Sequence, residues 1–201
     1  MRRIINSTYI TLDGVIESPQ NWPSGRHEDD GRGREIQTEL LLSCDAVLLG
    51  RRTYEGFEPV WSAMSGDPAS DQMNAIEKWV VSSTLTNPTW NNSEVINGDV
   101  AAEIARRKDQ DGANIVQYGV GPVTDLLLAQ GLLDELRLWV HPFMLGSGTP
   151  SDLLFRPERR AQFELTEATP LASGIVVLTY QVACIGTAPA KARAAASAGD
   201  Q

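Results

Sequence analysis

Short apolar runs alternate along this chain with stretches whose apolar residues recur at helical spacing, and this alternation constrains the fold more than any other feature. The runs with the length and composition of strands are Ile4 to Leu12, 45–49 (DAVLL), 78–82 (KWVVS), 94–96 (EVI), 114–118 (NIVQY) and 135–141 (ELRLWVH). Helices are expected at 35–43, from Thr53 to about Trp61, at 99–107 and at 122–130. Strands that alternate with helices imply a parallel sheet whose strands are joined by helical crossovers.

The end of the chain follows a different pattern. Two strand-like runs, 162–168 and 175–182, follow each other without a helix, and Pro170 and Gly174 between them favour a turn. The predicted fold is therefore α/β, with a mostly parallel twisted sheet flanked by helices and an antiparallel C-terminal strand. We expect one domain over 1–183, with loops at 18–33 and 65–70. The remainder, 184–201, has little to bury and is expected to be a disordered Ala-rich tail.

The composition narrows the classes of partner. The chain has 201 residues and a net charge of -9, which argues against nucleic acid or an anionic membrane as a partner, since either needs a basic face. Its two cysteines, Cys44 and Cys184, lie far apart, so neither a disulfide framework nor a metal site is predicted. We find no signal-peptide pattern, and no apolar run approaches the roughly 20 residues that span a bilayer. A cytoplasmic soluble protein is expected, and the net charge does not exclude a small anionic ligand.

Four segments follow apparent strands and carry groups that can hold an anion. In the first, 50–53 (GRRT), Gly50 permits a close backbone approach, Arg51 and Arg52 supply charged donors, and Thr53 can cap the following helix. A phosphate fits such a turn, although a solvated basic turn explains the same residues. The second segment, 82–84 (SST), places three hydroxyl groups after a strand, and an ordinary turn is the alternative there.

The third segment is 119–123 (GVGPV). Two glycines follow a strand, and Pro122 is expected at the first position of a helix, where a phosphate can approach the backbone. The complete dinucleotide fingerprint G-x-G-x-x-G is not present, because Thr124 occupies the position of its third glycine. A tight strand-to-helix turn is therefore an alternative interpretation. The fourth segment, 145–150 (LGSGTP), is expected to be a flexible loop that can close on a ligand.

In this order the segments resemble those of the dihydrofolate reductase superfamily. Within it, the chain is most similar to the branch formed by the reductase domain of the bifunctional riboflavin-biosynthesis deaminase/reductase and its stand-alone relatives. The residues that carry the resemblance are 11–16 (TLDGVI), 49–55 (LGRRTYE), 80–83 (VVSS), 119–123 (GVGPV) and 145–150 (LGSGTP). The resemblance covers about residues 3–183. It implies a dihydrofolate reductase-like fold, NADPH as cofactor, and reduction of a small C=N or C=O compound, a pyrimidine- or pterin-like substrate among them.

The resemblance also assigns residues to the cofactor. It places the first segment beside the adenosine phosphates, the serines near the 2'-phosphate, the GVGPV turn at the pyrophosphate, and two further residues beside the nicotinamide, with a threonine closing over the cofactor. The implied set is Gly50, Arg51, Arg52 and Thr53; Ser82 and Ser83; Gly119, Val120, Gly121, Pro122 and Val123; Tyr9 and Ile16; and Thr149.

The substrate side departs from the superfamily pattern. Folate reductases use a carboxylate on the helix after the Trp loop, and here Arg34 falls at that spacing, with Glu35 next to it. The catalytic candidates are Asp13, Trp22 and Glu35. Each has a structural alternative, respectively an Asp-Gly turn, a loop anchor and an exposed first-turn acid.

Two further expectations concern function and assembly. A non-catalytic nucleotide- or small-ligand-binding protein on the same fold is the alternative to a reductase. We expect a homodimer, as in relatives of this branch. The 135–141 strand points to the same conclusion, because Trp139 lies opposite the apolar face of Leu136, Leu138 and Val140, and both faces of a strand cannot be exposed if both are apolar.

Overall fold

The structure, a computed structural model, describes residues 1–23, 30–155 and 160–183. The strands are β1 (Ile4–Thr11), β2 (Cys44–Gly50), β3 (Glu77–Val81), β4 (Ser93–Ile96), β5 (Asn114–Tyr118), β6 (Glu135–His141), β7 (Gln162–Pro170) and β8 (Val176–Ala183). The helices are α1 (Arg32–Leu42), α2 (Arg51–Trp61), α3 (Pro68–Ala75), α4 (Val100–Asp109) and α5 (Pro122–Ala129), and 3-10 turns form at Pro19–Asn21 and Pro150–Asp152.

One sheet contains all these strands, in the order β4-β3-β2-β5-β1-β6-β8-β7. The strands from β4 to β6 pair in parallel, while β8 runs antiparallel to both β6 and β7. The predicted fold class is therefore confirmed. Parallel strands must start from the same end of the sheet, so each connection crosses over; helices form these crossovers except between β3 and β4, which a loop at 82–92 joins.

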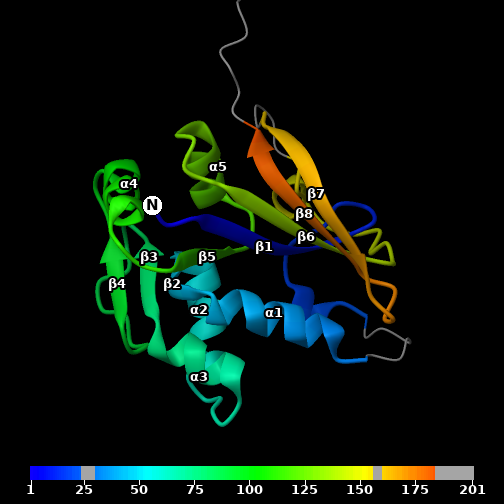
Figure 1. Cartoon of the computed structure of the whole chain (residues 1–201), viewed down its shortest axis with the longest axis horizontal. Helices are drawn as coiled ribbons and strands as arrows, with labels where there is room; N and C mark the ends of the chain where they lie inside the picture. The colour runs from blue at the N-terminus through cyan, green and yellow to red at the C-terminus, as the bar shows by residue number, and fades with distance from the viewer. Residues whose placement is uncertain (24–29, 156–159, 184–201) are drawn as a thin grey trace, which may run out of the picture.

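Helices cover both faces of the sheet (Figure 1). On one face, α1 and its neighbours α2 and α3 enclose an apolar cluster that includes Leu41, Val47 and Met73. On the other face, α4 and α5 enclose a second cluster around Ile4, Trp79 and Leu127. Among the described residues, no helix has both the length and the apolar character that crossing a membrane requires.

Several element boundaries differ from the sequence-based prediction. The segment 65–70 was expected to be a loop, but α3 begins within it, because the Asp67 carboxylate accepts hydrogen bonds from the N–H groups of Ala69 and Ser70. Helix α1 begins at Arg32, so the preceding loop is shorter than predicted. The expected tail, 184–201, lies outside the described residues.

Candidate functional site

The carboxyl ends of the neighbouring parallel strands β2 and β5 bring two helix N-termini together. Helix α2 begins directly after Gly50, and α5 begins four residues after β5 ends. A Cβ placed on Gly50 would lie 3.6 Å from Val123 Cγ2, and one placed on Gly119 would lie 3.7 Å from Thr53 Oγ1. The first and third segments proposed from the sequence for anion binding are thus adjacent in space.

The GVGPV turn has an open backbone at this junction. Gly119 has φ +75°, a conformation that favours glycine, and Gly121 is the N-cap of α5. Pro122 is the first residue of α5, as predicted. Nothing lies within 4 Å of a Cβ placed on Gly121, whereas Val120 is buried against Ile16 and Ile10. The turn therefore leaves its Gly121 side open to a ligand.

The arginine pair lies at the start of α2, in exposed positions. Arg51 donates to the carboxylate of Glu55 at 2.9 Å, and Arg52 pairs with Glu17 at 3.6 Å. The prediction that Thr53 caps this helix is wrong, because Gly50 is the N-cap and Thr53 is the third helical residue. Its hydroxyl instead lies beside the Gly119 turn.

The serine segment follows β3, which pairs with β2 on the side away from β5. Ser82 is buried, and its Oγ accepts hydrogen bonds from the N–H groups of Thr84 at 3.1 Å and Leu85 at 2.9 Å. Ser82 therefore stabilises the local turn, as the structural alternative required, while Ser83 is exposed. Both lie at the same carboxyl edge of the sheet as the arginines.

An aromatic cluster forms where β1 and β6 end. The ring of Tyr9 lies 5.8 Å from that of Trp139 and 5.0 Å from that of His141, and the ring of Trp22 lies 5.2 Å from His141 and 5.8 Å from Phe143. The His141 Nε2 is buried and has no hydrogen-bond partner within the described part of the chain. Burial lowers the pKa of His141, which favours the neutral imidazole.

Helix α1 covers the sheet beside this cluster. Gln37 contacts Ser7 Oγ at 3.4 Å and the Tyr9 hydroxyl at 3.5 Å, and the Trp139 indole N–H donates to Ser7 Oγ at 3.0 Å. Gly33 faces Trp139, since a Cβ there would lie 3.7 Å from the indole ring. The ring of Trp139 thus occupies the space between Gly33 and the sheet, and no carboxylate of the helix lies there.

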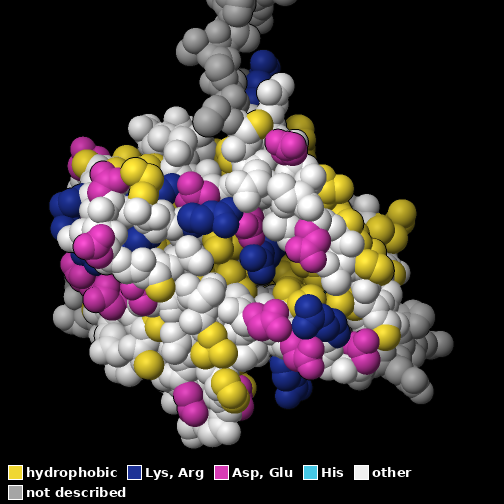
Figure 2. All heavy atoms as spheres, viewed as in Figure 1, with side chains coloured by type: hydrophobic (Ala, Val, Ile, Leu, Met, Phe, Trp, Pro, Cys, Tyr) yellow, Lys and Arg dark blue, Asp and Glu magenta, His cyan; other side chains and the backbone are white. Residues whose placement is uncertain are grey.

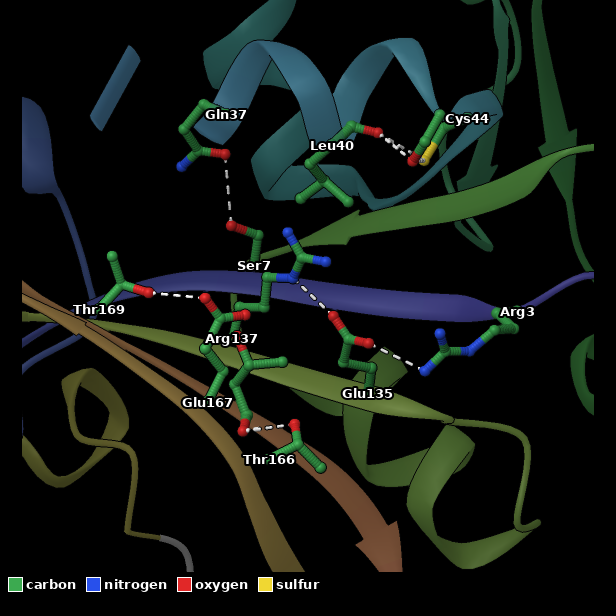
Figure 3. A network of polar contacts seen from close by, with 12 residues as sticks. Arg3, Ser7, Gln37, Leu40, Cys44, Glu135, Arg137, Thr166, Glu167 and Thr169 are labelled. Carbon is green, nitrogen blue, oxygen red and sulfur yellow. Dashed lines mark hydrogen bonds and ion pairs between the residues drawn. The ribbon is translucent and has the colours of Figure 1, made fainter. Parts of the chain in front are cut away.

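Figure 3 shows the contact between Gln37 and Ser7 above the sheet, and an ion-pair network next to it. Glu135, which is buried, accepts from Arg3 at 2.9 Å and from Arg137 at 2.5 Å. Two guanidinium groups therefore neutralise one buried carboxylate on this face of the sheet, as a buried charge requires.

The three catalytic candidates occupy different surroundings. Asp13 accepts a hydrogen bond from the Thr11 hydroxyl at 2.5 Å and one from the Gly146 N–H at 2.8 Å, and the bond from Thr11 is the main reason that its pKa is lowered. It thereby connects the turn after β1 with the loop after β6. Trp22 donates from its indole N–H to the Glu17 carbonyl at 3.0 Å, as a loop anchor would.

Glu35 lies on the solvent side of α1, where it pairs with Arg32 at 3.2 Å. The helix turns this carboxylate away from the sheet, which is the arrangement of an exposed first-turn acid. Thr149 is exposed, and its N–H and hydroxyl both donate to the Asp152 carboxylate, at 2.6 Å and 2.8 Å. These bonds begin the 3-10 turn at Pro150–Asp152 and hold the loop in place.

The chain also matches a known family. The model of the RibD C-terminal domain family matches residues 2–177. The chain belongs to the RibD C-terminal domain family. Two relatives come from Bacillus subtilis (strain 168): the uncharacterized protein YyaP, 28% identical over 89% of this chain and 94% of its own, and the uncharacterized protein YwjB, 26% identical over 74% and 82%.

Solved structures of RibD-like proteins share the fold. A putative riboflavin biosynthesis protein from Shewanella sp. PV-4 superposes with a TM-score of 0.65 at 21% identity, over 91% of this chain and 99% of its own. A deaminase/reductase from Thermotoga maritima gives a TM-score of 0.61 at 15% identity, over 90% of this chain and 57% of its own. At these identities the likeness concerns the fold, which is that of the RibD C-terminal domain.

Sequence-based reasoning missed a set of polar side chains beneath the GVGPV turn. Asn6 on β1 and Gln117 on β5 are 0% and 2% exposed, and both donate hydrogen bonds to the Gly119 carbonyl. The signal was present in the sequence, because an amide inside each of two apolar strand runs is unusual for a parallel sheet.

Proposed function

We propose that this RibD C-terminal domain protein is an NADPH-dependent oxidoreductase that reduces a small C=N or C=O compound. The observation that carries the proposal is the meeting of two helix N-termini, those of α2 and α5, at the carboxyl ends of β2 and β5. Such a place favours phosphate groups because unpaired N–H groups and the positive ends of two helix dipoles point at it. Membership of the RibD C-terminal domain family supports the same activity.

The donor groups at this junction suit a dinucleotide with an additional phosphate. Gly121 leaves the backbone of the turn open, and the Thr53 hydroxyl lies next to Gly119. Arg51 and Arg52, with Ser83, supply donors further along the same edge. We assign the pyrophosphate to the turn and the 2'-phosphate to the arginines, whose planar guanidinium groups can hold phosphate oxygens in pairs.

When bound, NADPH supplies the hydride for the reaction. The residues of this chain would bind the cofactor, orient its nicotinamide end toward the Tyr9 side of β1, and exclude water there. The aromatic cluster of Tyr9, Trp22 and His141 suits a flat acceptor, because aromatic rings stack on planar molecules. Gln37, an uncharged amide beside Ser7, can pair with a pyrimidine- or pterin-like edge.

A non-catalytic nucleotide- or small-ligand-binding role is the second candidate function. The observation that favours it is that the Asp13 carboxylate is bonded to Thr11 and Gly146, while Glu35 points to solvent. Neither group is placed to deliver a proton to an acceptor. The two functions differ in turnover, not in cofactor binding.

Measuring NADPH binding by calorimetry and NADPH oxidation with a panel of planar C=N and C=O compounds tests the proposal. We expect binding of NADPH and oxidation with at least one pyrimidine- or pterin-like compound. Binding without oxidation across the panel would favour the non-catalytic role, and failure to bind NADPH would exclude the NADPH-dependent reductase.

We also propose that the protein is a homodimer, although the structure changes one premise of the sequence-based prediction, namely that Trp139 must be covered by a second subunit. Trp139 needs no partner subunit, because α1, Leu171 and Val177 cover it within the chain. Apolar side chains do remain exposed along the β7–β8 hairpin, where Leu165 is 51% exposed, and Figure 2 shows hydrophobic side chains gathered on that side. A second copy would bury them, and a monomer mass by light scattering at micromolar concentration would contradict this.

The proposed location is the cytoplasm. Cys44 is a free, buried thiol, which suits a reducing compartment. Fractionation of the producing cells tests this location, and recovery outside the cytoplasmic fraction would contradict it.

A further inference from the structure

Beneath the GVGPV turn lies a network of buried, uncharged polar side chains. It consists of Asn6 and Thr8 on β1, Gln117 on β5 and Thr124 on α5, each at most 3% exposed. The Thr8 hydroxyl donates to Asn6 Oδ1 at 2.8 Å, and the Asn6 amide nitrogen donates to Gln117 Oε1. The network thus joins both strands and the helix that begins above them.

The Gly119 carbonyl is where these donors converge. Asn6 Nδ2 reaches it at 2.7 Å, Gln117 Nε2 at 2.9 Å, and the Thr124 hydroxyl at 3.3 Å. Two carboxamides from neighbouring strands therefore hold one carbonyl oxygen toward the interior of the protein. Any turn conformation that points this oxygen outward would leave one buried N–H of each carboxamide without an acceptor, because the other N–H groups bond to Gln117 Oε1 and Thr124 Oγ1, and an unpaired buried donor is costly.

The orientation of this carbonyl fixes the next N–H group. The peptide bonds of the described residues are trans, and in a trans peptide the C=O and the following N–H point in opposite directions. With the Gly119 oxygen directed inward, the Val120 N–H is directed outward. Within the described part of the chain, this N–H has no hydrogen-bond partner.

We infer that Asn6 and Gln117 are positioning residues that present the Val120 N–H to the pyrophosphate of the cofactor. The inference rests on the proposed function, and it adds residues that do not themselves touch the ligand. Buried amides contribute less to stability than apolar side chains of similar size in a parallel sheet, so their role is better explained by the turn that they orient. No ionisable group takes part, so the arrangement is insensitive to pH.

The test compares two ligands on three variants. Asn6→Leu and Gln117→Met each remove a donor to the Gly119 carbonyl, whereas Thr8→Val removes a hydrogen bond of the same buried network that does not reach it. NADPH carries the pyrophosphate, and adenosine 2'-monophosphate lacks it. Dissociation constants are measured by calorimetry, and thermal unfolding shows whether each variant is folded.

We expect Asn6→Leu and Gln117→Met to weaken NADPH binding at least about tenfold, while adenosine 2'-monophosphate binds within about twofold of the parent. Thr8→Val should bind both ligands as the parent does, even where it lowers the melting temperature. Unchanged NADPH affinity in both folded variants would overturn the inference, and so would an equal loss for both ligands, since that marks a general structural role.

A measurement on the parent protein needs no variant. Titration with inorganic pyrophosphate, followed by NMR, should shift the Val120 amide resonance more than those of amides elsewhere in the chain. A shift at Val120 without NADPH binding would reject the proposed function and overturn the assignment to the cofactor, while marking Val120 as the site of another pyrophosphate ligand. NADPH binding with no change at Val120 would support the function and overturn the inference.

Discussion

The proposed function predicts that selectivity for NADPH over NADH depends on two exposed arginines, and replacing both tests this assignment. The side chains of Arg51 and Arg52 are 47% and 75% exposed, and they pair with Glu55 and Glu17. A desolvated hydrogen bond to a charged group is worth about 1.5–3 kcal/mol. Because solvent screens groups this exposed, we take about 1 kcal/mol for each arginine.

The double variant Arg51→Ala/Arg52→Ala should therefore weaken NADPH binding by about 30-fold, which corresponds to about 2 kcal/mol. NADH binding should change little, since NADH lacks the 2'-phosphate. Calorimetric titration of both cofactors measures the two effects. The matched control is Arg106→Ala/Arg160→Ala, which removes the same charge from exposed positions outside the proposed cofactor site.

Replacing Glu55 by Gln gives a second check on the same reasoning. Its carboxylate competes with a bound phosphate for Arg51, since the two groups would share one guanidinium. Glu55→Gln should therefore tighten NADPH binding by a few-fold.

Equal loss of NADPH and NADH affinity in the arginine variant, or equal affinity of the parent protein for both cofactors, would refute the assignment of the 2'-phosphate.

Other predictions concern stability and the substrate side. Burial lowers the pKa of Lys78 to about 8, below its ordinary value of 10.5, so the unfolded chain binds this proton more tightly than the folded one. The free energy of unfolding of the parent, minus that of Lys78→Met, should therefore rise as the pH increases from about 8 to about 10.5, by at most about 3 kcal/mol. Urea unfolding near each of these pH values measures this difference, and a difference that does not change with pH would contradict the prediction. Gly112→Ala should lose about 2–4 kcal/mol in the same assay, because a Cβ there would lie 2.7 Å from Asp45 Oδ2, and a loss under about 1 kcal/mol would show that the site relaxes easily. In steady-state kinetics with an accepted substrate, Trp22→Ala should lower kcat/KM, while kcat/KM of Glu35→Gln should stay within about twofold of the parent. An equal loss of kcat/KM in both variants would indicate that Glu35 also contacts the substrate.

Much of the sheet could be predicted from the sequence, because the patterns that mark its strands and turns lie within short segments of the chain. The strands 114–118 and 135–141 have the predicted bounds, and Pro122 begins its helix where predicted. Apolar periodicity, glycines and prolines act within a few residues of themselves, so a single chain segment reveals them. Helix α3 was missed because it is short and begins in a stretch that contains Pro and Gly, where the Asp67 cap was its main signal.

The positions of the site residues depend on contacts between distant parts of the chain, which no local sequence pattern shows. Thr53 was assigned as a cap from its place in the sequence, but the fold uses it to line the Gly119 turn. Glu35 was a candidate because it lies next to Arg34, which falls at the family spacing, but the rotation of α1 turns Glu35 to solvent while Gln37 faces the sheet. Helical phase relative to a sheet is set by packing, which involves residues far away in the chain.

The sequence alone determined the α/β class, the order of the turns proposed to bind phosphate and the resemblance to the reductases of riboflavin biosynthesis. Only the tertiary structure placed Asn6 and Gln117 on neighbouring strands, with their amides on one carbonyl of the GVGPV turn. The two residues are 111 positions apart in the chain. Their meeting follows from strand order and register, which are decided by the burial of both faces of the sheet at once.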